Sequence, residues 1–413
     1  MTGAQAVFET RHALIAYWRA RRIRSRAQLE AVQQKRLSRW LRNVVPNVPF
    51  YRDFAGAKLA DLPIVDKATL MVDFARFNTA GITNEQGWAA FEGDKTVGDY
   101  IVGASTGTSG NRGLFVISQA ERFRWLGTIL AKALPGFWRE THRVAILLPL
   151  NTPLYDSANR LRRLSLRFFD VGGEWQEGLA AFNPTVIVAP PKILRMMADA
   201  GMALRPHRVF AGAETLDPLD RVVIEAYFGL TLGQIYMGTE GLFAVSCEKG
   251  ALHLCEDTMH FELPVVADDR ELREVIISDF SRDVQVMARY RMNDLVRLGP
   301  PCSCGLPQRV LAEVVGRADD CFDLPGGMLT PDLLRNAVVD ADRSITDFRV
   351  IQTGAAEVVV IVPPGADTAA VQLAFAALFA RKGVTAALTV HFDDLVPEMS
   401  RKLRRVENRY GRG

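Results

Sequence analysis

The chain has 413 residues, of which 48% are hydrophobic and 23% are charged. Such a chain is long enough for two or three domains with cores of their own, and its composition excludes a wholly disordered or fibrous protein. Its 50 lysines and arginines against 47 aspartates and glutamates give a net charge of +3, which is too small to indicate nucleic acid as the main partner.

No apolar run reaches the roughly 20 residues that a membrane-spanning helix needs. The first residues also lack the basic, apolar and small-residue order of a signal peptide. The cysteines are odd in number: Cys247, Cys255, Cys302, Cys304 and Cys321. In a chain of this length without a signal peptide they indicate reduced thiols, so we expect a cytoplasmic protein without a membrane span.

Residues 8–44 combine many arginines with apolar residues at helical spacing, which predicts one or two amphipathic helices. Basic amphipathic helices can bind a membrane surface or a partner protein. Because Glu9 and Glu30 interrupt the positive charge, we favour a solvated face packed on the body of the protein, with surface binding as the alternative.

Between about residue 100 and residue 300, short β-rich segments alternate with helical patterns. The predicted strands are 143–150, 185–189, 208–211, 231–236 and 274–279, and the predicted helices are 119–134, 192–200 and 218–228. This alternation predicts an α/β fold with a largely parallel sheet.

The pattern changes after Gly316. A helix at 330–341, strands at 347–352 and 357–362, a helix at 368–382 and a strand at 387–393 predict a small α+β unit. We place the boundary near Arg317–Asp320, which gives a large N-terminal domain of residues 1–317 and a small C-terminal domain of residues 318–413.

The strongest local motif is Ala-Ser-Thr-Gly-Thr-Ser-Gly-Asn-Arg-Gly at residues 104–113. Its glycines let the backbone curl so that several N–H groups point into one concavity, and hydroxyl groups and Arg112 add donors and charge. A polyphosphate needs such a set of groups. The motif lacks the Gly-Lys-Ser/Thr ending of a Walker loop, and a plain loop is the alternative.

Three further segments are candidates for nucleotide contacts. Ile235–Gly241 follows a predicted strand, where α/β proteins place ligands, and its Glu240 could hold a divalent metal. Asp294 could accept hydrogen bonds from a ribose diol. The basic segment Ser400–Arg405 could bring one lysine to a developing negative charge. Taken singly, these segments also fit a turn, a surface strand and a solvated basic face.

Together with Gly316–Asp320, and in this order, these segments resemble those of the adenylate-forming superfamily, most closely its phenylacetate–CoA ligase and coenzyme F390 synthetase-like branch. The resemblance covers nearly the whole chain and includes Val-Pro-Phe-Tyr at 48–51, Leu-Pro-Ile-Val-Asp-Lys at 62–67 and Phe-Ala-Gly-Ala-Glu-Thr-Leu at 210–216. It implies an α/β fold, with a large N-terminal domain of mixed sheets flanked by helices and a small, mobile α+β domain.

The resemblance also implies roles for single residues. The loop that would hold the β- and γ-phosphates of ATP consists of Ser105, Thr106, Gly107, Thr108, Ser109 and Gly110. Ala213 and Glu214 would lie along the adenine. Tyr236, Gly238, Thr239 and Glu240 match a motif in which the threonine contacts the α-phosphate and the glutamate binds Mg²⁺.

Further matches concern the ribose and the mobile domain. Asp294 and Arg317 match residues that contact the ribose, and Asp319 or Asp320 matches the hinge. Lys402 matches the catalytic lysine that contacts the carboxylate and the α-phosphate during adenylation.

The chain departs from the family pattern in three places. Asn111-Arg112 stands where many members have Lys-Pro, so Arg112 could substitute for the lysine charge. Asn293 stands where glycine usually precedes the ribose aspartate, a position that Asn tolerates. Ser400-Arg401 precedes Lys402 where glycine is usual, which makes that loop less flexible. Arg404 and Arg405 belong to the alternative interpretation, in which this segment is an ordinary solvated basic one.

Three thiols and one imidazole form a candidate metal site. Cys247, His253, Cys302 and Cys304 offer the Cys₃His set of a closed structural zinc site, and Cys255 could replace one ligand. Their context looks like that of zinc ligands in some phenylacetate–CoA ligase-like proteins. The Cys-x-Cys spacing is not the common one, and buried inert cysteines are the alternative.

The leading hypothesis is therefore an ATP- and Mg²⁺-dependent ligase that converts a carboxylic acid, expected to be aromatic, to an acyl-adenylate and passes it to coenzyme A. A second hypothesis keeps adenylation but transfers the acyl group to an acyl carrier protein, an amine or another nucleophile. A third is a regulatory relative that binds nucleotide without turnover. A homodimer is a possible assembly, and nucleic acid is not expected as a partner.

Overall fold

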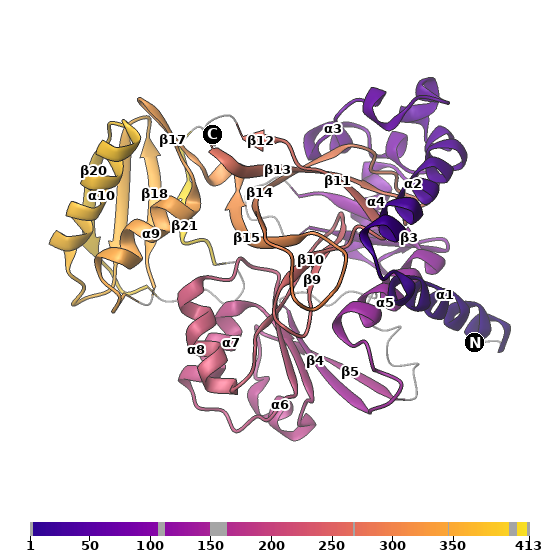
Figure 1. The fold of residues 1–413 in the computed structure, drawn as a ribbon, viewed down its shortest axis with the longest axis horizontal. Helices are drawn as coiled ribbons and strands as arrows, with labels where there is room; N and C mark the ends of the chain where they lie inside the picture. The colour runs from indigo at the N-terminus through magenta and orange to yellow at the C-terminus, as the bar shows by residue number, and fades with distance from the viewer. Residues whose placement is uncertain are drawn as a thin grey trace.

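The computed structural model describes residues 3–105, 112–148, 163–266, 269–345, 347–395 and 403–410. A large α/β body is followed by a smaller α+β unit at the C-terminal end of the chain (Figure 1). This arrangement confirms the predicted fold class. Within these ranges we find no helix with the length and apolar character needed to cross a bilayer.

The two predicted N-terminal helices are present as α1 (Gly3–Arg22) and α2 (Arg26–Asn43). Ser25 caps α2 by accepting a hydrogen bond from the backbone N–H of Gln28, which satisfies one of the unpaired donors of the first turn. Each helix buries a few side chains and exposes most of the others, so both are amphipathic as the sequence predicts.

The segment after α2 contains short helices, of which α3 (Lys67–Val72) and α4 (Asn84–Glu92) are the longest α-helical ones. It leads to a small antiparallel sheet formed by β1 (Thr96–Val97), β2 (Tyr100–Ala104) and β3 (Leu114–Ser118). Helix α5 (Gln119–Ala133) follows directly, capped by Ser118 in a reciprocal arrangement with Glu121.

The main sheet has twelve strands in the described residues, in the order β11-β13-β14-β15-β10-β9-β8-β7-β6-β4-β5, with β12 paired to β13. Its parallel half consists of β4 (His142–Leu148), β5 (Leu164–Asp170), β6 (Val186–Ala189), β7 (Arg208–Gly212) and β8 (Gly233–Gly238). Its antiparallel half consists of β9 (Gly241–Ser246), β10 (Leu252–Leu254), β11 (Met259–Glu262), β12 (Val265–Val266), β13 (Asp269–Asp279), β14 (Tyr290–Gly299) and β15 (Val310–Arg317).

The prediction of a largely parallel sheet was therefore correct only for β4–β8. Parallel neighbours need a crossover of a dozen or more residues, whereas antiparallel neighbours need only a short turn. Most links between β9 and β15 are short, and the described residues there contain no α-helix, so β9–β10, β12–β13, β13–β14 and β14–β15 pair as antiparallel neighbours.

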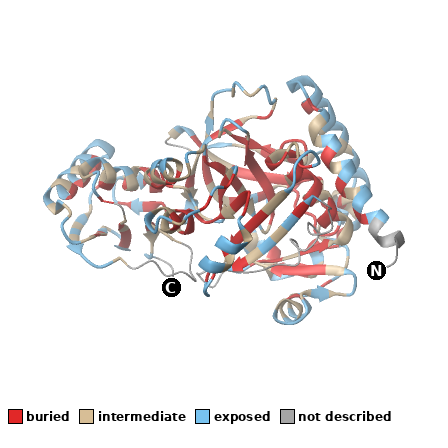
Figure 2. Ribbon diagram, turned by 90° about the horizontal axis from the view of Figure 1, so that it is seen from below, coloured by how far each residue is buried: buried red, intermediate tan, exposed pale blue. Residues whose placement is uncertain are grey.

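Alternate residues of the parallel strands pack against helices on opposite faces. On β4, Val144 and Ile146 share a core with α1 and α5, whereas Ala145 and Leu147 face α6 (Gln176–Phe182), α7 (Pro191–Asp199) and α8 (Pro218–Phe228). This alternation follows from the two-residue period of a strand. Buried residues accordingly concentrate along the central strands (Figure 2).

The C-terminal unit has a hydrophobic core of its own, built from residues between Phe322 and Val406. It contains the hairpin β16 (Phe322–Leu324) and β17 (Gly327–Leu329), helices α9 (Pro331–Ala341) and α10 (Thr368–Lys382), and a sheet in the order β20-β19-β18-β21. These strands are β18 (Arg349–Gly354), β19 (Glu357–Val362), β20 (Ala387–Phe392) and β21 (Val406–Asn408). The unpredicted strand β21 returns the chain to the junction with the large body.

Candidate active site and metal centre

A polar cavity of about 910 Å³ lies where the parallel half of the sheet meets the antiparallel half. Nine of the residues predicted to contact nucleotide line it: Ser105, Ala213, Glu214, Tyr236, Gly238, Thr239, Glu240, Asp294 and Arg317. The remaining predicted residues, Thr106–Gly110 and Lys402, lie outside the described residues. Sequence segments more than 200 residues apart thus share one cavity.

Tyr236 and Asp294 connect the two halves of the sheet across this cavity. The Tyr236 hydroxyl on β8 donates a hydrogen bond of 2.5 Å to Asp294 on β14, and the ring packs against Phe243 at 4.8 Å between centroids. Burial, followed by the neighbouring Asp294 charge, holds the pKa of Tyr236 well above its usual value. The phenol therefore remains a hydrogen-bond donor and fixes the orientation of the carboxylate.

Glu240 is a carboxylate on the cavity wall, and its hydrogen-bond partners in the described part of the chain are hydroxyl groups. Its side chain accepts hydrogen bonds from Thr239 at 2.9 Å and from Tyr290 at 3.3 Å, and the residue is 8% exposed. No ion pair joins it to a lysine or arginine among the described residues. A buried carboxylate without a cationic partner suits a bound cation, and carboxylate oxygens are ligands that Mg²⁺ accepts.

The turn after β7 is held in an unusual backbone conformation. Ala213 has φ 66°, a left-handed value that is rare for a residue with a side chain. The next residue, Glu214, forms an ion pair of 3.2 Å with Lys192, and both side chains are almost fully buried. Strained backbone of this kind concentrates at ligand-binding sites, in agreement with the position of Ala213 on the cavity wall.

Lys67 is a cavity residue to which the sequence assigned no role. Val65 forms an isolated parallel bridge with Tyr290, and this pairing carries the following residues to the edge of the cavity. The Lys67 side chain runs beside Gly113, so that a Cβ atom on Gly113 would lie 3.3 Å from the Lys67 Cε. The sequence feature that could have identified Lys67 as a cavity residue is its position in the Val-Asp-Lys motif.

Arg112 does not line this polar cavity. Its guanidinium sits 5.1 Å from the ring centroids of both Trp88 and Phe91, and the residue is not part of the cavity wall. The aromatic rings of α4 offer it a cation–π site on the outside of the protein. The suggestion that Arg112 supplies the charge of the usual lysine stays a prediction, and Lys67 is a cation that does line the cavity.

A β-bulge aims Arg317 at the cavity. Asp294 pairs with Arg317 and Leu295 with Gly316, but Val296 pairs with Val314, so β15 carries one extra residue at this point. Such a bulge turns the local strand and re-aims its side chains. Gly316 has φ 145°, which favours glycine there. As a result Asp294 and Arg317 are direct neighbours.

Residues 403–405 of the C-terminal unit dock beside this cavity. The backbone N–H of Leu403 donates to Glu214 at 3.2 Å, and Arg404 forms an ion pair with Asp320. Arg405 reaches Asp220 on α8 at 2.8 Å and Asp217 at 3.6 Å, while its Nε contacts Asp347 of its own unit at 3.2 Å. These contacts join the two parts of the chain directly after Lys402.

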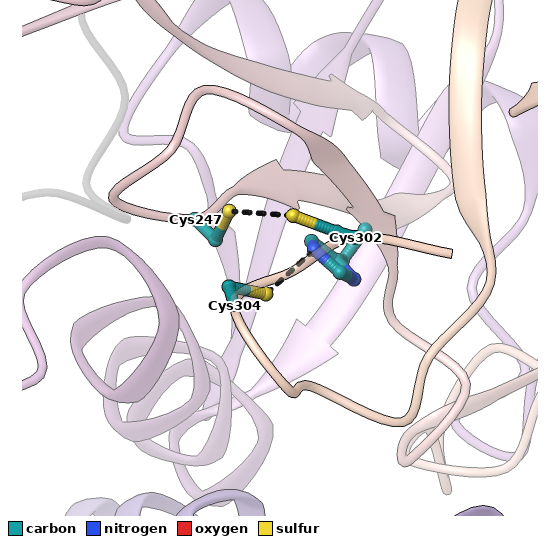
Figure 3. A group of neighbouring side chains, drawn as sticks. Cys247, Cys302 and Cys304 are labelled. Atoms are coloured by element: carbon teal, nitrogen blue, oxygen red, sulfur yellow. Dashed lines mark hydrogen bonds between the residues drawn. The ribbon is translucent and has the colours of Figure 1, made fainter. Parts of the chain in front are cut away.

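The predicted metal ligands converge. The ligand atoms of Cys247, His253, Cys302 and Cys304 all lie within 4.8 Å of one another (Figure 3). The sulfurs of Cys247 and Cys302 are 3.9 Å apart, close to the roughly 3.8 Å between two thiolates on a tetrahedral zinc. Nδ1 of His253 lies 3.2 Å from the Gln308 carbonyl, which leaves Nε2 toward the cysteines.

Cys255 does not belong to this cluster. It is fully buried in the core beneath α5, and burial raises the pKa of its thiol to about 12. The alternative in which Cys255 replaces one metal ligand is therefore excluded. The four clustered residues come from the β9–β10 hairpin and the β14–β15 loop, so a metal there would join these two hairpins.

A second, largely apolar cavity of about 1520 Å³ adjoins the polar one. The two share wall residues at the end of β8, among them Gly238 and Thr239. Trp125 lines the apolar cavity, whereas Tyr236 and Phe243 line the polar one.

No family model matches the chain. Curated relatives are phenylacetate–coenzyme A ligases: one from Pseudomonas putida is 26% identical over 347 residues, and one from Escherichia coli is 26% identical over 354 residues. Both alignments cover 76% of this chain and 76% of the relative.

Solved structures with the same fold include a 2-hydroxyisobutyryl-CoA ligase. In its postadenylation state, in complex with R3-HIB-AMP, it matches with a TM-score of 0.65 at 17% identity, over 92% of this chain and 88% of that one. Its thioesterification state gives 0.50 at 18% identity, over 94% and 90%.

ATP-bound MatB from Rhodopseudomonas palustris matches over 74% of this chain with a TM-score of 0.53 and 15% identity. The sequence similarity and the two-part architecture point to the same group of proteins. The chain is a relative of the phenylacetate–coenzyme A ligases and has the fold of the adenylate-forming ligases.

Proposed function

We propose that this protein is an ATP-dependent ligase that activates a carboxylic acid as an acyl-adenylate and then transfers the acyl group to coenzyme A. The observation that carries the proposal is the convergence of Ser105, Glu240 and Asp294 on one polar cavity that opens into an apolar one. The relatives described above, which are named CoA ligases, support it.

The nucleotide occupies the polar cavity. Asp294, oriented by Tyr236, accepts hydrogen bonds from the ribose, with Arg317 beside it, and Ala213 and Glu214 border the base. Lys67 and the segment that begins at Ser105 take the phosphates, because a cation and a sequence rich in glycine and hydroxyl residues favour anions. The protein thereby brings two anionic reactants together, which is the main demand of this reaction.

Glu240 is the proposed Mg²⁺ ligand, because it is buried, faces the cavity and lacks a cationic partner in the described chain. A divalent cation there would neutralise charge on the phosphate oxygens. Thr239 stands between Glu240 and the apolar cavity, so its hydroxyl is placed to contact the α-phosphate next to the incoming carboxylate.

The C-terminal unit acts as the lid of the site. The segment that follows Lys402 is anchored to the large body by Leu403 and Arg405, and Lys402 is the proposed catalytic lysine of this lid. We place the boundary between the domains at residue 317, where β15 ends and the short helix Ala318–Asp320 begins. Release of this segment would let the domain rotate for the transfer step.

The acid occupies the apolar cavity, whose aromatic and aliphatic walls suit an aryl or other apolar acid. Coenzyme A is the proposed acceptor, since the named relatives are coenzyme A ligases; a carrier-protein thiol remains the second candidate.

Zinc at the Cys₃His cluster is proposed as a structural ion, because the protein supplies all four ligands of a tetrahedral site and leaves no coordination position open for a substrate. Five free cysteines favour a reducing compartment such as the cytoplasm.

ATP–pyrophosphate exchange with a panel of acids tests the proposal. Exchange should require both an acid and Mg²⁺, and Glu240→Gln should abolish most of it. Mass spectrometry of the products with and without coenzyme A then identifies the acceptor. A protein that binds ATP but gives no exchange with any acid would contradict the assignment.

A further inference from the structure

The apolar cavity is larger than a small aryl acid requires. Pockets that enclose drug-sized ligands measure about 300–1,000 Å³. The apolar cavity measures about 1520 Å³. A monocyclic arylacetic acid, smaller than most such ligands, would leave most of this space empty, at a cost in lost packing contacts.

The cavity extends across the whole parallel half of the sheet. Its described wall includes residues from each of the five strands in order: Ile235 on β8, Phe210 on β7, Val188 on β6, Ile146 on β4 and Leu166 on β5. Neighbouring strands lie about 4.8 Å apart, so the four steps from β8 to β5 span roughly 19 Å. Thr239 follows β8, at one end of this distance.

Helices close the cavity opposite the sheet. Trp125 and Ile129 of α5 cover it, and α1 and α2 contribute a further wall that includes Ile15, Ala16 and Val32. Helix α1 packs closely against α5. A Cβ atom on Gly127 would lie only 2.0 Å from the carbonyl oxygen of Ala13, so only glycine fits where the two helices cross. The wall is thus part of the packed body (Figure 1).

Charged groups at the cavity are unevenly distributed. The lining carboxylates already have partners; for example, Asp257 pairs with Lys132 and Asp283 with Arg124. By contrast, the exposed cations on the α1 and α2 wall form no ion pair within the described chain; they are Arg19, Arg22, Lys35 and Arg39. A positive rim on an apolar interior attracts an anion that carries a long apolar group.

We propose that the substrate is an elongated, largely apolar monocarboxylic acid, longer than a monocyclic arylacetic acid. Its carboxylate reaches Thr239, and its tail extends across β7, β6 and β4 toward β5 beneath α5. This inference rests on the proposed function and specifies the class of acid. A tail of this length buries apolar surface on both walls, and each buried methylene contributes about 0.8 kcal/mol.

The test compares exchange rates for phenylacetic, 4-phenylbutyric, 8-phenyloctanoic and tetradecanoic acids. The kcat/KM for acid should rise with tail length, by about tenfold or more between the first and the third acid, because the added methylenes are buried. Leu166→Trp fills the β5 end of the cavity and should lower the ratio of long-acid to short-acid exchange. Ser165→Trp is the matched control, since Ser165 is exposed on the same strand and absent from the wall, and it should leave the ratio unchanged.

Circular dichroism and thermal melting confirm that both variants fold. Exchange with phenylacetic acid alone, with the longer acids inactive, would overturn the inference and leave the proposed function intact. An equal ratio in both tryptophan variants would also overturn it. Absence of exchange with every acid would instead count against the adenylation reaction itself.

Discussion

Arg405 provides the sharpest test of the lid. Its side chain is 13% exposed and lies between Asp220, Asp217 and Asp347, the first two on the large body and the third on its own unit. Burial lowers the pKa of this guanidinium, but the three carboxylates, Asp220 first, outweigh it and raise the pKa above its usual value, so Arg405 is charged at any assay pH. Its ion pairs with Asp217 and Asp220 exist only while the two parts are docked as they are here.

Removing one partner of a buried ion pair costs about 3–5 kcal/mol. Asp220 keeps a second contact, with Arg195 at 3.4 Å, so the free-energy cost of Arg405→Met should lie near the lower end of this range. A loss of about 3 kcal/mol shifts the docking equilibrium roughly a hundredfold. Because undocking returns Asp217 and Asp220 to water, the variant favours the undocked arrangement over the docked one.

The assay separates the two half-reactions. Pyrophosphate exchange, which needs the docked arrangement, should fall by up to about a hundredfold in Arg405→Met. Thioester formation from a supplied acyl-adenylate should change little. Arg409→Met is the control, because the Arg409 side chain is 61% exposed and pairs only with Glu407. Unchanged exchange in Arg405→Met, or an equal loss in both half-reactions at an unaltered melting temperature, would refute the reasoning.

Three further variants address single groups. Lys67→Met should raise the KM for ATP about tenfold, because one charge-assisted hydrogen bond to the phosphates is lost. The control is Lys58→Met, at an exposed lysine, which should leave this KM unchanged. Equal KM values for the two variants would show that Lys67 does not contact the phosphates. Tyr236→Phe keeps the ring packed on Phe243 but removes the hydroxyl that donates to Asp294. ATP binding, measured by titration, should weaken by about 0.5–1.5 kcal/mol. An unchanged affinity for ATP would show that Asp294 does not need this hydrogen bond to hold its orientation. Cys302→Ser should lose bound zinc and melt at a lower temperature, whereas Cys255→Ser should retain the metal on elemental analysis; sub-stoichiometric metal in the parent protein would end the zinc proposal.

Local periodicity was sufficient for helices α1, α2, α5 and α7–α10 and for the parallel strands β4 and β6–β8, but it missed helices α3, α4 and α6 and the parallel strand β5. The 3.6-residue pattern of residues 8–44 and the caps around α5 and α8 are properties of neighbouring residues, and the structure has these helices within a few residues of the prediction. The strands β1–β3, β9–β12, β14–β17 and β21 were missed as well. Several of them, such as β1, β10, β16, β17 and β21, have only two or three residues, which is too short for a periodic pattern to be recognised.

The order of the motifs was enough to predict that separated segments form one nucleotide cavity, because each motif carries its own backbone and side-chain chemistry. Only the tertiary structure showed that Lys67 lines that cavity, through the pairing of Val65 with Tyr290, and that the Arg112 guanidinium lies against Trp88 and Phe91. Likewise, the residue types indicated a metal cluster, but only the pairing of two distant hairpins excluded Cys255 from it. Contacts between residues far apart in sequence depend on strand register and helix crossing, which no local pattern encodes.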